Sequence, residues 1–324
     1  MKKRFIKIAA IVTVPLLLIR RVSLIFIKNI LAAVPDRNNM PPESPASAEY
    51  LSADPSKATY TENRRKLRAM GNEFEQTMQD AEITNSDALK LKAKYRMQND
   101  QPHNWIISIH GYKDSHHFML PYGAVFYQKG YNVLLPDNRA HGASEGDYIG
   151  MGWLDKKDIS EWIQWVIDQD SEANIILHGI SMGGATVMMT AGDNLDHVVG
   201  YVEDCGYTSV WDIFACVMKR DYHLPAFPIL HTCRLISRYR LGYDYVEASA
   251  LTQIRKCDKP MFFIHGEKDD FVPTYMGHQL YEAFPGKKDI YIAKNAGHAN
   301  AMDFDPETYF AKVFEFIDSN IQFG

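Results

Sequence analysis

The segment NIILHGISMGG, residues 174–184, decides how this chain folds. It begins with an apolar run typical of a buried strand and ends in small residues suited to the start of a helix. Between them, Ser181 has Gly179 two residues before it and Gly183 two residues after it. A sharp strand-to-helix turn requires this spacing, because φ is positive at the serine and larger flanking side chains would collide. The segment therefore predicts a nucleophilic serine, with the backbone N–H of Met182 placed to stabilise an oxyanion.

Apolar strands separated by helix-sized segments continue on both sides of this turn. Strands that are apolar throughout are typical of a parallel sheet covered by helices on both faces. The predicted strands are residues 105–109, 131–135, 174–178, 197–203, 260–265 and 289–293. The predicted helices are residues 61–79, 120–129, 155–170, 183–193, 275–284 and 306–321. The fold class is therefore α/β, with a mostly parallel central sheet.

Two intervals depart from this rhythm. Residues 89–96 alternate apolar and basic side chains, which predicts a strand with one solvated face, paired as an antiparallel hairpin with residues 81–84 at the sheet edge. Residues 208–249 lie between two strands and are too many for one crossover helix. An inserted helical cap over the carboxyl edge of the sheet accounts for their length.

Two later turns supply candidate partners for Ser181. Asp269 and Asp270 both follow the strand predicted at 260–265, and His298 follows the last predicted strand. His298 is placed to accept the Ser181 proton and return it to a leaving group, and either carboxylate could hold the imidazole in the required tautomer. A nucleophile, an acid and a base in this chain order predict a catalytic triad.

The loop after residues 105–109 offers a second oxyanion donor, the N–H of Tyr112, because Gly111 lets the backbone approach closely. His116 and His117 follow it. Neighbouring residues rarely point the same way and no acidic ligand is spaced with them, so we interpret both as surface or pocket-rim residues. The remaining histidines are interpreted as turn or core residues: His103, His141, His178, His197, His223, His231, His265 and His278.

No cofactor or metal is predicted, because a triad supplies its own nucleophile activation and oxyanion stabilisation. The four cysteines contain no CxxC pair and are interpreted as buried free thiols: Cys205, Cys216, Cys233 and Cys257. The net charge is −5, but residues 1–40 hold eight basic residues and one acidic residue, so the remainder carries −12. An acidic body argues against nucleic acid as a partner, since phosphate binding depends on lysine and arginine.

The N-terminal residues 1–34 are interpreted as a membrane anchor or a signal-like segment. Residues 8–19 form an apolar run of twelve, whereas a bilayer crossing needs about 20 residues. Residues 5–34, as one helix, could span a bilayer only if Arg20 and Arg21 reach an interface.

An alternative for this segment is a helix lying along anionic lipid, with Lys7, Arg21 and Lys28 forming a basic stripe. Residues 35–60 are rich in proline and predict a linker to a catalytic domain over residues 61–324. The chain is then expected at the cell membrane, with its catalytic domain outside the cytoplasm. A cleaved secretory signal and a secreted protein form the competing hypothesis.

Five stretches together resemble the serine α/β-hydrolase superfamily, and more closely its YqkD-like group of membrane-associated bacterial hydrolases. The resemblance runs from about residue 80 to the C-terminus. The stretches are His110-Gly111-Tyr112, PDNRAHGASEG at 136–146, the turn at 179–183, HGEKDDFVP at 265–273 and Gly297-His298. The fourth stretch aligns its aspartate with Asp269, which the resemblance therefore favours over Asp270. The second stretch departs from the family at Ala140, where glycine is usual.

The resemblance implies an α/β-hydrolase fold and a serine hydrolase that cleaves carboxylic esters or thioesters through an acyl-enzyme on Ser181. A small-molecule or lipid-like ester is then the substrate. Two alternatives stay open: a peptidase or amidase with the same triad, and a catalytically silent membrane-tethered binding domain. Asp137 and Arg139 could bind a substrate carboxylate, but a buried ion pair or a hydrogen-bonded turn is the preferred interpretation. Apolar cap residues suit either an acyl pocket or core packing: Trp211, Phe214, Met218, Tyr222, Leu224 and Phe227.

Overall fold

The structure, a computed structural model, describes residues 2–33, 55–100 and 102–323. Strands of these residues form one eight-stranded sheet in the order β1-β2-β4-β3-β5-β6-β7-β8. The strands are β1 (Gln79–Thr84), β2 (Lys90–Arg96), β3 (Asn104–Ile109), β4 (Asn132–Pro136), β5 (Asn174–Ile180), β6 (Val198–Asp204), β7 (Met261–Gly266) and β8 (Lys288–Ala293). β1 pairs with β2 and β2 with β4 in antiparallel fashion, and the pairs from β4 to β8 are parallel. The predicted fold class is confirmed.

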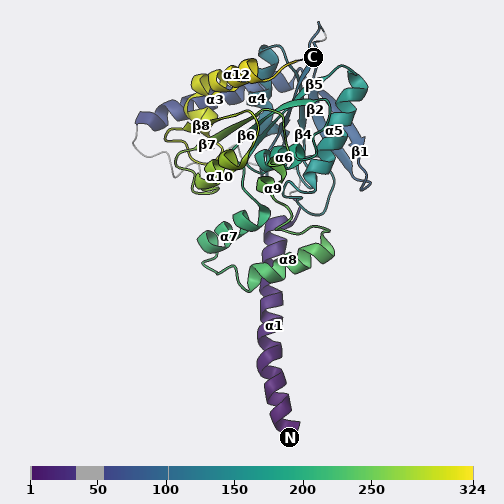
Figure 1. Ribbon diagram of the computed structural model, residues 1–324, viewed down its shortest axis with the longest axis vertical. Helices are drawn as coiled ribbons and strands as arrows, with labels where there is room; N and C mark the ends of the chain where they lie inside the picture. Colours follow the sequence, from purple (N-terminus) through teal and green to yellow (C-terminus); the bar gives the residue numbers. More distant parts are fainter. Residues whose placement is uncertain (1, 34–54, 101, 324) are drawn as a thin grey trace.

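Helices cover both faces of this sheet (Figure 1). They are α4 (His116–Gln128), α5 (Asp155–Gln169), α6 (Met182–Ala191), α9 (Ala250–Ile254), α10 (Tyr275–Ala283), the short α11 (Ala301–Phe304) and α12 (Pro306–Asn320). Successive strand residues point to opposite faces, so Ile107 of β3 joins the core that contains Trp162 of α5, while Ile106 joins the core that contains Phe126 of α4. This two-sided burial explains why these strands are apolar throughout.

The antiparallel edge of the sheet is the hairpin that the alternating pattern predicts. Ala81 of β1 lies opposite Ala93 of β2. Leu91 and Ala93 are buried, whereas Lys90, the first residue of β2, is exposed. One face of β2 therefore packs on the core and the other faces solvent.

Two helices lie between β6 and α9, where the sequence predicts the cap: α7 (Val210–Asp221) and α8 (Ile229–Arg240). Figure 1 shows both beyond one end of the sheet. The chain enters α7 directly after the carboxyl end of β6, and the Ser209 hydroxyl accepts the N–H of Asp212 to cap this helix. The cap is thereby fixed at the edge of the sheet where parallel strands end.

The N-terminal segment forms one helix, α1 (Lys2–Leu31), whose far end projects away from the body in Figure 1. Its last part packs into the body: Phe26, Ile27 and Leu31 are buried in the core shared with the cap. The Ser23 hydroxyl donates to the carbonyl of Ile229 at the start of α8. None of the helices in the described ranges is long and apolar enough to cross a membrane, so the transmembrane interpretation finds no support here.

The starts of two helices differ by several residues from the sequence-based expectation. Residues 35–54 of the predicted linker lie outside the described residues, but 55–60 form the first turns of α3 (Pro55–Glu75), with the proline at a position where its missing N–H costs nothing. α3 also ends at Glu75 rather than at 79, and the residues from Gln79 form β1. α4 begins at His116 rather than at 120. The Asp137 carboxylate accepts the His116 N–H at 2.8 Å and satisfies a donor of the first turn.

Candidate active site

The turn between β5 and α6 holds Ser181 in a strained backbone conformation, with φ 58° and ψ −114°. Glycine is required on both sides. A Cβ on Gly179 would overlap the carbonyl oxygen of Gly183, and a Cβ on Gly183 would overlap that of Ile109. The Ser181 N–H donates to the carbonyl of Asp204 at 2.7 Å, which ties the turn to β6. Close packing of neighbouring strands and α6 thus maintains a positive φ that a serine otherwise avoids.

The imidazole of His298 lies beside this serine, although β8, which precedes it, is the edge strand of the sheet. His298 follows β8, and its Nε2 lies 2.8 Å from Ser181 Oγ. Ser181 is buried, at 6% exposure, while the His298 side chain is 21% exposed. The pair can therefore pass a proton between them, with one side of the imidazole open to an incoming molecule.

Asp269, in the turn after β7, holds the opposite side of the ring. His298 Nδ1 donates to Asp269 Oδ2 at 2.8 Å, and Oδ1 accepts the N–H groups of Phe271 and Val272 at 3.0 and 2.9 Å. Asp270 is exposed. Burial works against the charged form of Asp269, but hydrogen bonds from His265 and His298 lower its pKa to about 2. An ionised carboxylate here keeps the Nε2 of His298 available to accept a proton.

His265 stands behind the acid and is more than the core residue that we expected. Its Nε2 donates to the carbonyl of Val272 at 2.8 Å and lies 3.4 Å from Asp269 Oδ2. Burial lowers the pKa of His265, yet Asp269 and the Val272 carbonyl outweigh it and raise that pKa. The position of His265 inside the HGEKD stretch was the available signal, and it pointed only to a family motif.

Both predicted oxyanion loops lie beside the serine. A Cβ on Gly111 would lie 3.4 Å from Ser181 Cβ, so this loop packs directly against the turn. Met182 is the first residue of α6, whose leading N–H groups have no acceptor inside the helix. The Tyr112 hydroxyl reaches away to the carbonyl of Ile30, 2.5 Å distant, and links this loop to α1.

Arg220 of the cap, which no sequence pattern singled out, binds the loop that carries Asp269. The Arg220 guanidinium of α7 donates to the carbonyls of Asp270 and Phe271 at 3.1 and 3.2 Å. It also lies 4.4 Å from the centre of the Phe271 ring, which in turn lies 4.8 Å from the His298 ring. The cap is thus coupled to the segment that carries Asp269.

Arg139 and Asp137 have structural partners, as preferred, although they are not partners of each other. Arg139 forms a fork with Asp158 at 2.6 and 2.7 Å and also contacts Asp87 at 2.9 Å. Asp137 accepts the N–H groups of His116 and Ala143. Ala140, which follows Arg139, has φ 62°, which explains why glycine is usual there in the family.

Two groups of three potential metal ligands occur in the described ranges, and one of them overlaps the predicted triad: Cys205, Asp269 and His298. Burial raises the pKa of the Cys205 thiol well above its ordinary value, so a thiolate ligand is disfavoured there. The cysteines are free, and three of them are buried. The second group, Glu75, His116 and His117, shares no residue with the predicted triad.

A strained serine after a parallel strand, an imidazole within hydrogen-bond distance and an acid behind it define a serine α/β-hydrolase, and the chain belongs to this superfamily. A family model described as "Serine aminopeptidase, S33" matches residues 100–218. The chain is 33% identical over 231 residues to the protein YqkD of Bacillus subtilis. The matched region covers 71% of this chain and 75% of YqkD.

Two further proteins extend the comparison. A thermostable monoacylglycerol lipase of a Bacillus species is 21% identical over 230 residues, covering 65% of this chain and 89% of the lipase. An esterase of Pyrococcus furiosus superposes with a TM-score of 0.59 at 24% identity, covering 76% of this chain and 93% of the esterase. At this identity the superposition establishes the fold alone.

Proposed function

We propose that this protein hydrolyses carboxylic esters or thioesters through an acyl-enzyme on Ser181. The observation that carries the proposal is the chain of two 2.8 Å contacts, from Ser181 Oγ to His298 Nε2 and from His298 Nδ1 to Asp269 Oδ2. A free serine hydroxyl is a weak nucleophile at neutral pH and needs such a base.

Acylation follows from this geometry. As Ser181 Oγ bonds to the carbonyl carbon, His298 Nε2 takes its proton, and the carbonyl oxygen becomes an oxyanion that accepts the N–H groups of Met182 and Tyr112. Collapse of this intermediate breaks the bond to the leaving alcohol or thiol, which takes the proton from His298. Water then repeats the sequence on the acyl-enzyme, releasing the carboxylic acid and restoring the hydroxyl.

The names of the proteins to which this chain is similar support the preference for esters. The lipase and the esterase to which it is similar are named for ester hydrolysis, whereas the family model is named for an aminopeptidase. Phe214 and Met218 of the cap are buried in the core, so packing accounts for these two of the residues first considered for an acyl pocket. The proposal is therefore a small ester or lipid-like ester of unspecified acyl length.

A substrate panel tests this proposal. Purified protein is assayed with p-nitrophenyl esters of increasing acyl length, the matching thioesters and aminoacyl p-nitroanilides, alongside Ser181→Ala. We expect turnover of esters or thioesters that the variant loses. Larger kcat/KM values on the anilides would instead favour the peptidase alternative, and no turnover of any member would favour the silent binding domain.

We also propose that the projecting part of α1 binds an anionic lipid surface. This binding would account for the attachment at the cell membrane that the sequence predicts. Leu16, Leu17 and Leu18 are each more than half exposed, and Arg20 and Arg21 follow them with exposed side chains. Sedimentation with phosphatidylglycerol vesicles should exceed that with phosphatidylcholine vesicles, and serine at all three leucines should abolish it. Equal sedimentation of both proteins would reject the attachment. A catalytic domain outside the cytoplasm, or secretion, stays a prediction.

A further inference from the structure

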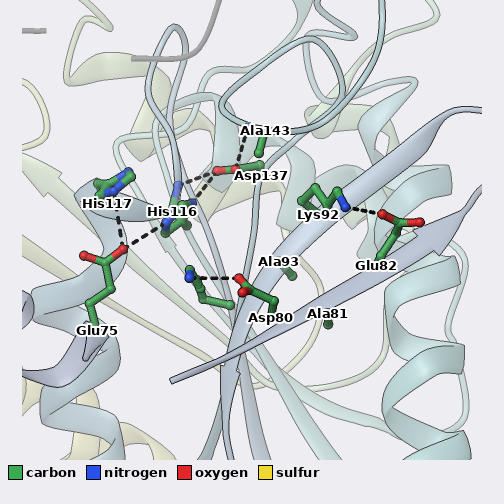
Figure 2. A pocket seen from close by; sticks show the side chains of 11 residues that line it. Glu75, Asp80, Ala81, Glu82, Lys92, Ala93, His116, His117, Asp137 and Ala143 are labelled. Carbon is green, nitrogen blue, oxygen red and sulfur yellow. Dashed lines mark hydrogen bonds and ion pairs between the residues drawn. The ribbon is translucent and has the colours of Figure 1, made fainter. Parts of the chain in front are cut away.

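A cavity of about 450 Å³ lies beside the antiparallel edge of the sheet, between the end of α3 and the start of α4. Apart from three alanines, its lining residues are all acidic, basic or histidine, and none of them belongs to the proposed triad. Figure 2 shows the lining residues, which are Glu75, Asp80, Ala81, Glu82, Lys92, Ala93, Lys94, His116, His117, Asp137 and Ala143. The carboxylates on the strands already have partners, because Lys92 pairs with Glu82 and Lys94 with Asp80.

Three other side chains of this cavity converge on one point. Glu75 Oε1 lies 3.5 Å from His116 Nε2 and 3.4 Å from His117 Nε2. The three ligand atoms all lie within 4.8 Å of one another. Figure 2 shows both imidazoles directed at the same carboxylate, which reaches them from a different helix. The two rings are only 4.1 Å apart, centre to centre.

The buried member of this cluster is held in the orientation of a metal ligand. His116 is 7% exposed, and its Nδ1 donates to Asp137 Oδ1 at 2.9 Å. Its Nε2 is buried and has no hydrogen-bond partner in the part of the chain that the structure describes. Metal-binding histidines typically donate one ring N–H to a carboxylate, which fixes the tautomer and leaves the other nitrogen's lone pair for the metal.

We propose that Glu75, His116 and His117 bind a divalent transition metal ion of the zinc class. Zinc bonds to histidine nitrogen and carboxylate oxygen are about 2.0–2.1 Å long, so tetrahedral geometry separates two ligand atoms by about 3.3–3.4 Å. The observed 3.4 Å to His117 falls within this range, and the 3.5 Å to His116 lies just above it. Two imidazoles and one carboxylate are also a ligand set that zinc accepts, with a fourth position left open.

A metal explains this cluster better than an ion pair alone. Two protonated imidazoles with ring centres 4.1 Å apart would repel each other, even though the carboxylates of Glu75 and Asp137 balance their charge. Neutral imidazoles avoid that repulsion. The ring nitrogens and the carboxylate oxygens of the cluster then have too few protons to form hydrogen bonds with one another. A divalent cation satisfies all three ligand atoms at once, which is why such sites gather them.

The ion would tie Glu75, the last residue of α3, to the first turn of α4. α4 directly follows the loop that carries Tyr112, so the metal would act as a structural clamp between α3 and the helix that follows this loop. A ligand that binds only the folded state raises its stability, so the metal should raise the midpoint of thermal unfolding.

Metal titration of the untagged full-length protein tests this inference. After chelation and desalting, Co²⁺ is added and followed by its visible absorption, and Zn²⁺ binding is measured by calorimetry. We expect one equivalent of metal, a cobalt spectrum typical of tetrahedral coordination and a raised unfolding midpoint. Glu75→Gln and His117→Ala should each weaken binding at least about tenfold, the scale on which even outer-shell changes act.

His103→Ala is the matched control, because this exposed histidine also contacts two carboxylates, those of Asp170 and Glu172 at 2.7 and 3.1 Å. It should bind metal as the wild type does. Circular dichroism and covalent labelling of Ser181 verify that each variant is folded. Absence of saturable binding by the wild type, unchanged affinity in either ligand variant, or an equal loss in the control would each overturn the inference.

Discussion

The guanidinium of Arg220 lies over the ring of Phe271, 4.4 Å from its centre, and so connects a cap helix to the loop that carries the proposed catalytic acid. Its hydrogen bonds to the carbonyls of Asp270 and Phe271 reinforce this contact. Since Phe271 also packs against His298, the contact from Arg220 reaches the imidazole through the Phe271 ring.

Arg220 is therefore expected to act as a positioning residue. Arg220→Ala should lower kcat for ester hydrolysis several-fold with little change in KM, because the acid loop loses support while substrate contacts stay. Arg220→Lys keeps the charge but loses the planar stacking, so its kcat should fall between the two. Steady-state kinetics on one p-nitrophenyl ester measure this, and an unchanged kcat in the alanine variant would rule out the role.

Replacing each acid in turn distinguishes Asp269 from Asp270. Asp269→Asn should reduce kcat on the order of 10⁴-fold, because an amide cannot hold His298 in the productive tautomer. Asp270→Asn should leave kcat little changed, since its side chain is exposed. The reverse pattern would mean that the assignment of the acid is wrong.

Glu203 predicts a pH dependence of stability. This carboxyl is fully buried, and desolvation raises its pKa from 4.5 to about 8. The folded state therefore binds the proton more tightly than the unfolded state, so stability falls as the pH rises from the unfolded to the folded pKa. The loss is up to ~1.4 kcal/mol per pH unit for one proton.

Glu203→Gln removes this contribution to the pH dependence of stability. The glutamine amide oxygen can still accept the Gly206 N–H, as Glu203 Oε2 does. Urea unfolding between pH 5 and 8 should show the variant gaining stability relative to the wild type as the pH rises. Asp155, another buried carboxyl whose pKa is raised to about 7, is present in both proteins and cancels in the difference. A difference that is constant with pH would contradict the expectation.

The hairpin turn contains a residue that strains the edge of the sheet. Ala88 has φ 61° and is exposed between Asn85 and Leu89. Ala88→Gly should raise the free energy of unfolding by ~0.5–1 kcal/mol, because the left-handed conformation costs alanine ~1–2 kcal/mol and the added flexibility of unfolded glycine offsets part of this. Ala140→Gly should gain less, since the buried Ala140 methyl is lost. Thermal or urea unfolding measures both, and destabilisation by Ala88→Gly would contradict the argument.

The strands and the proposed triad were predictable because their signals are local or ordered along the chain. The two flanking glycines predict the turn at Ser181, and apolar runs predict the strands β3 to β8. The start of α4 was not predictable, because the carboxylate that satisfies the His116 N–H comes from Asp137, 21 residues later. Glu75 likewise meets His116 and His117 from a separate helix, so no spacing rule could have joined them.

The packing of α1 against the cap was also beyond the sequence. An apolar run flanked by basic residues indicates lipid or a signal, and it does not reveal that Phe26 and Leu31 find partners in the core. Roles for Ser181, His298 and Asp269 in catalysis stay a proposal, supported by their mutual distances.

The central claim is that the Ser181 hydroxyl is the reactive nucleophile of this protein. Intact-mass spectrometry after reaction with a fluorophosphonate, followed by peptide mapping, tests it most directly. The account predicts one adduct per chain, located on Ser181, absent from Ser181→Ala and formed far more slowly in His298→Ala. An adduct on another residue, or undiminished ester hydrolysis by Ser181→Ala, would contradict it.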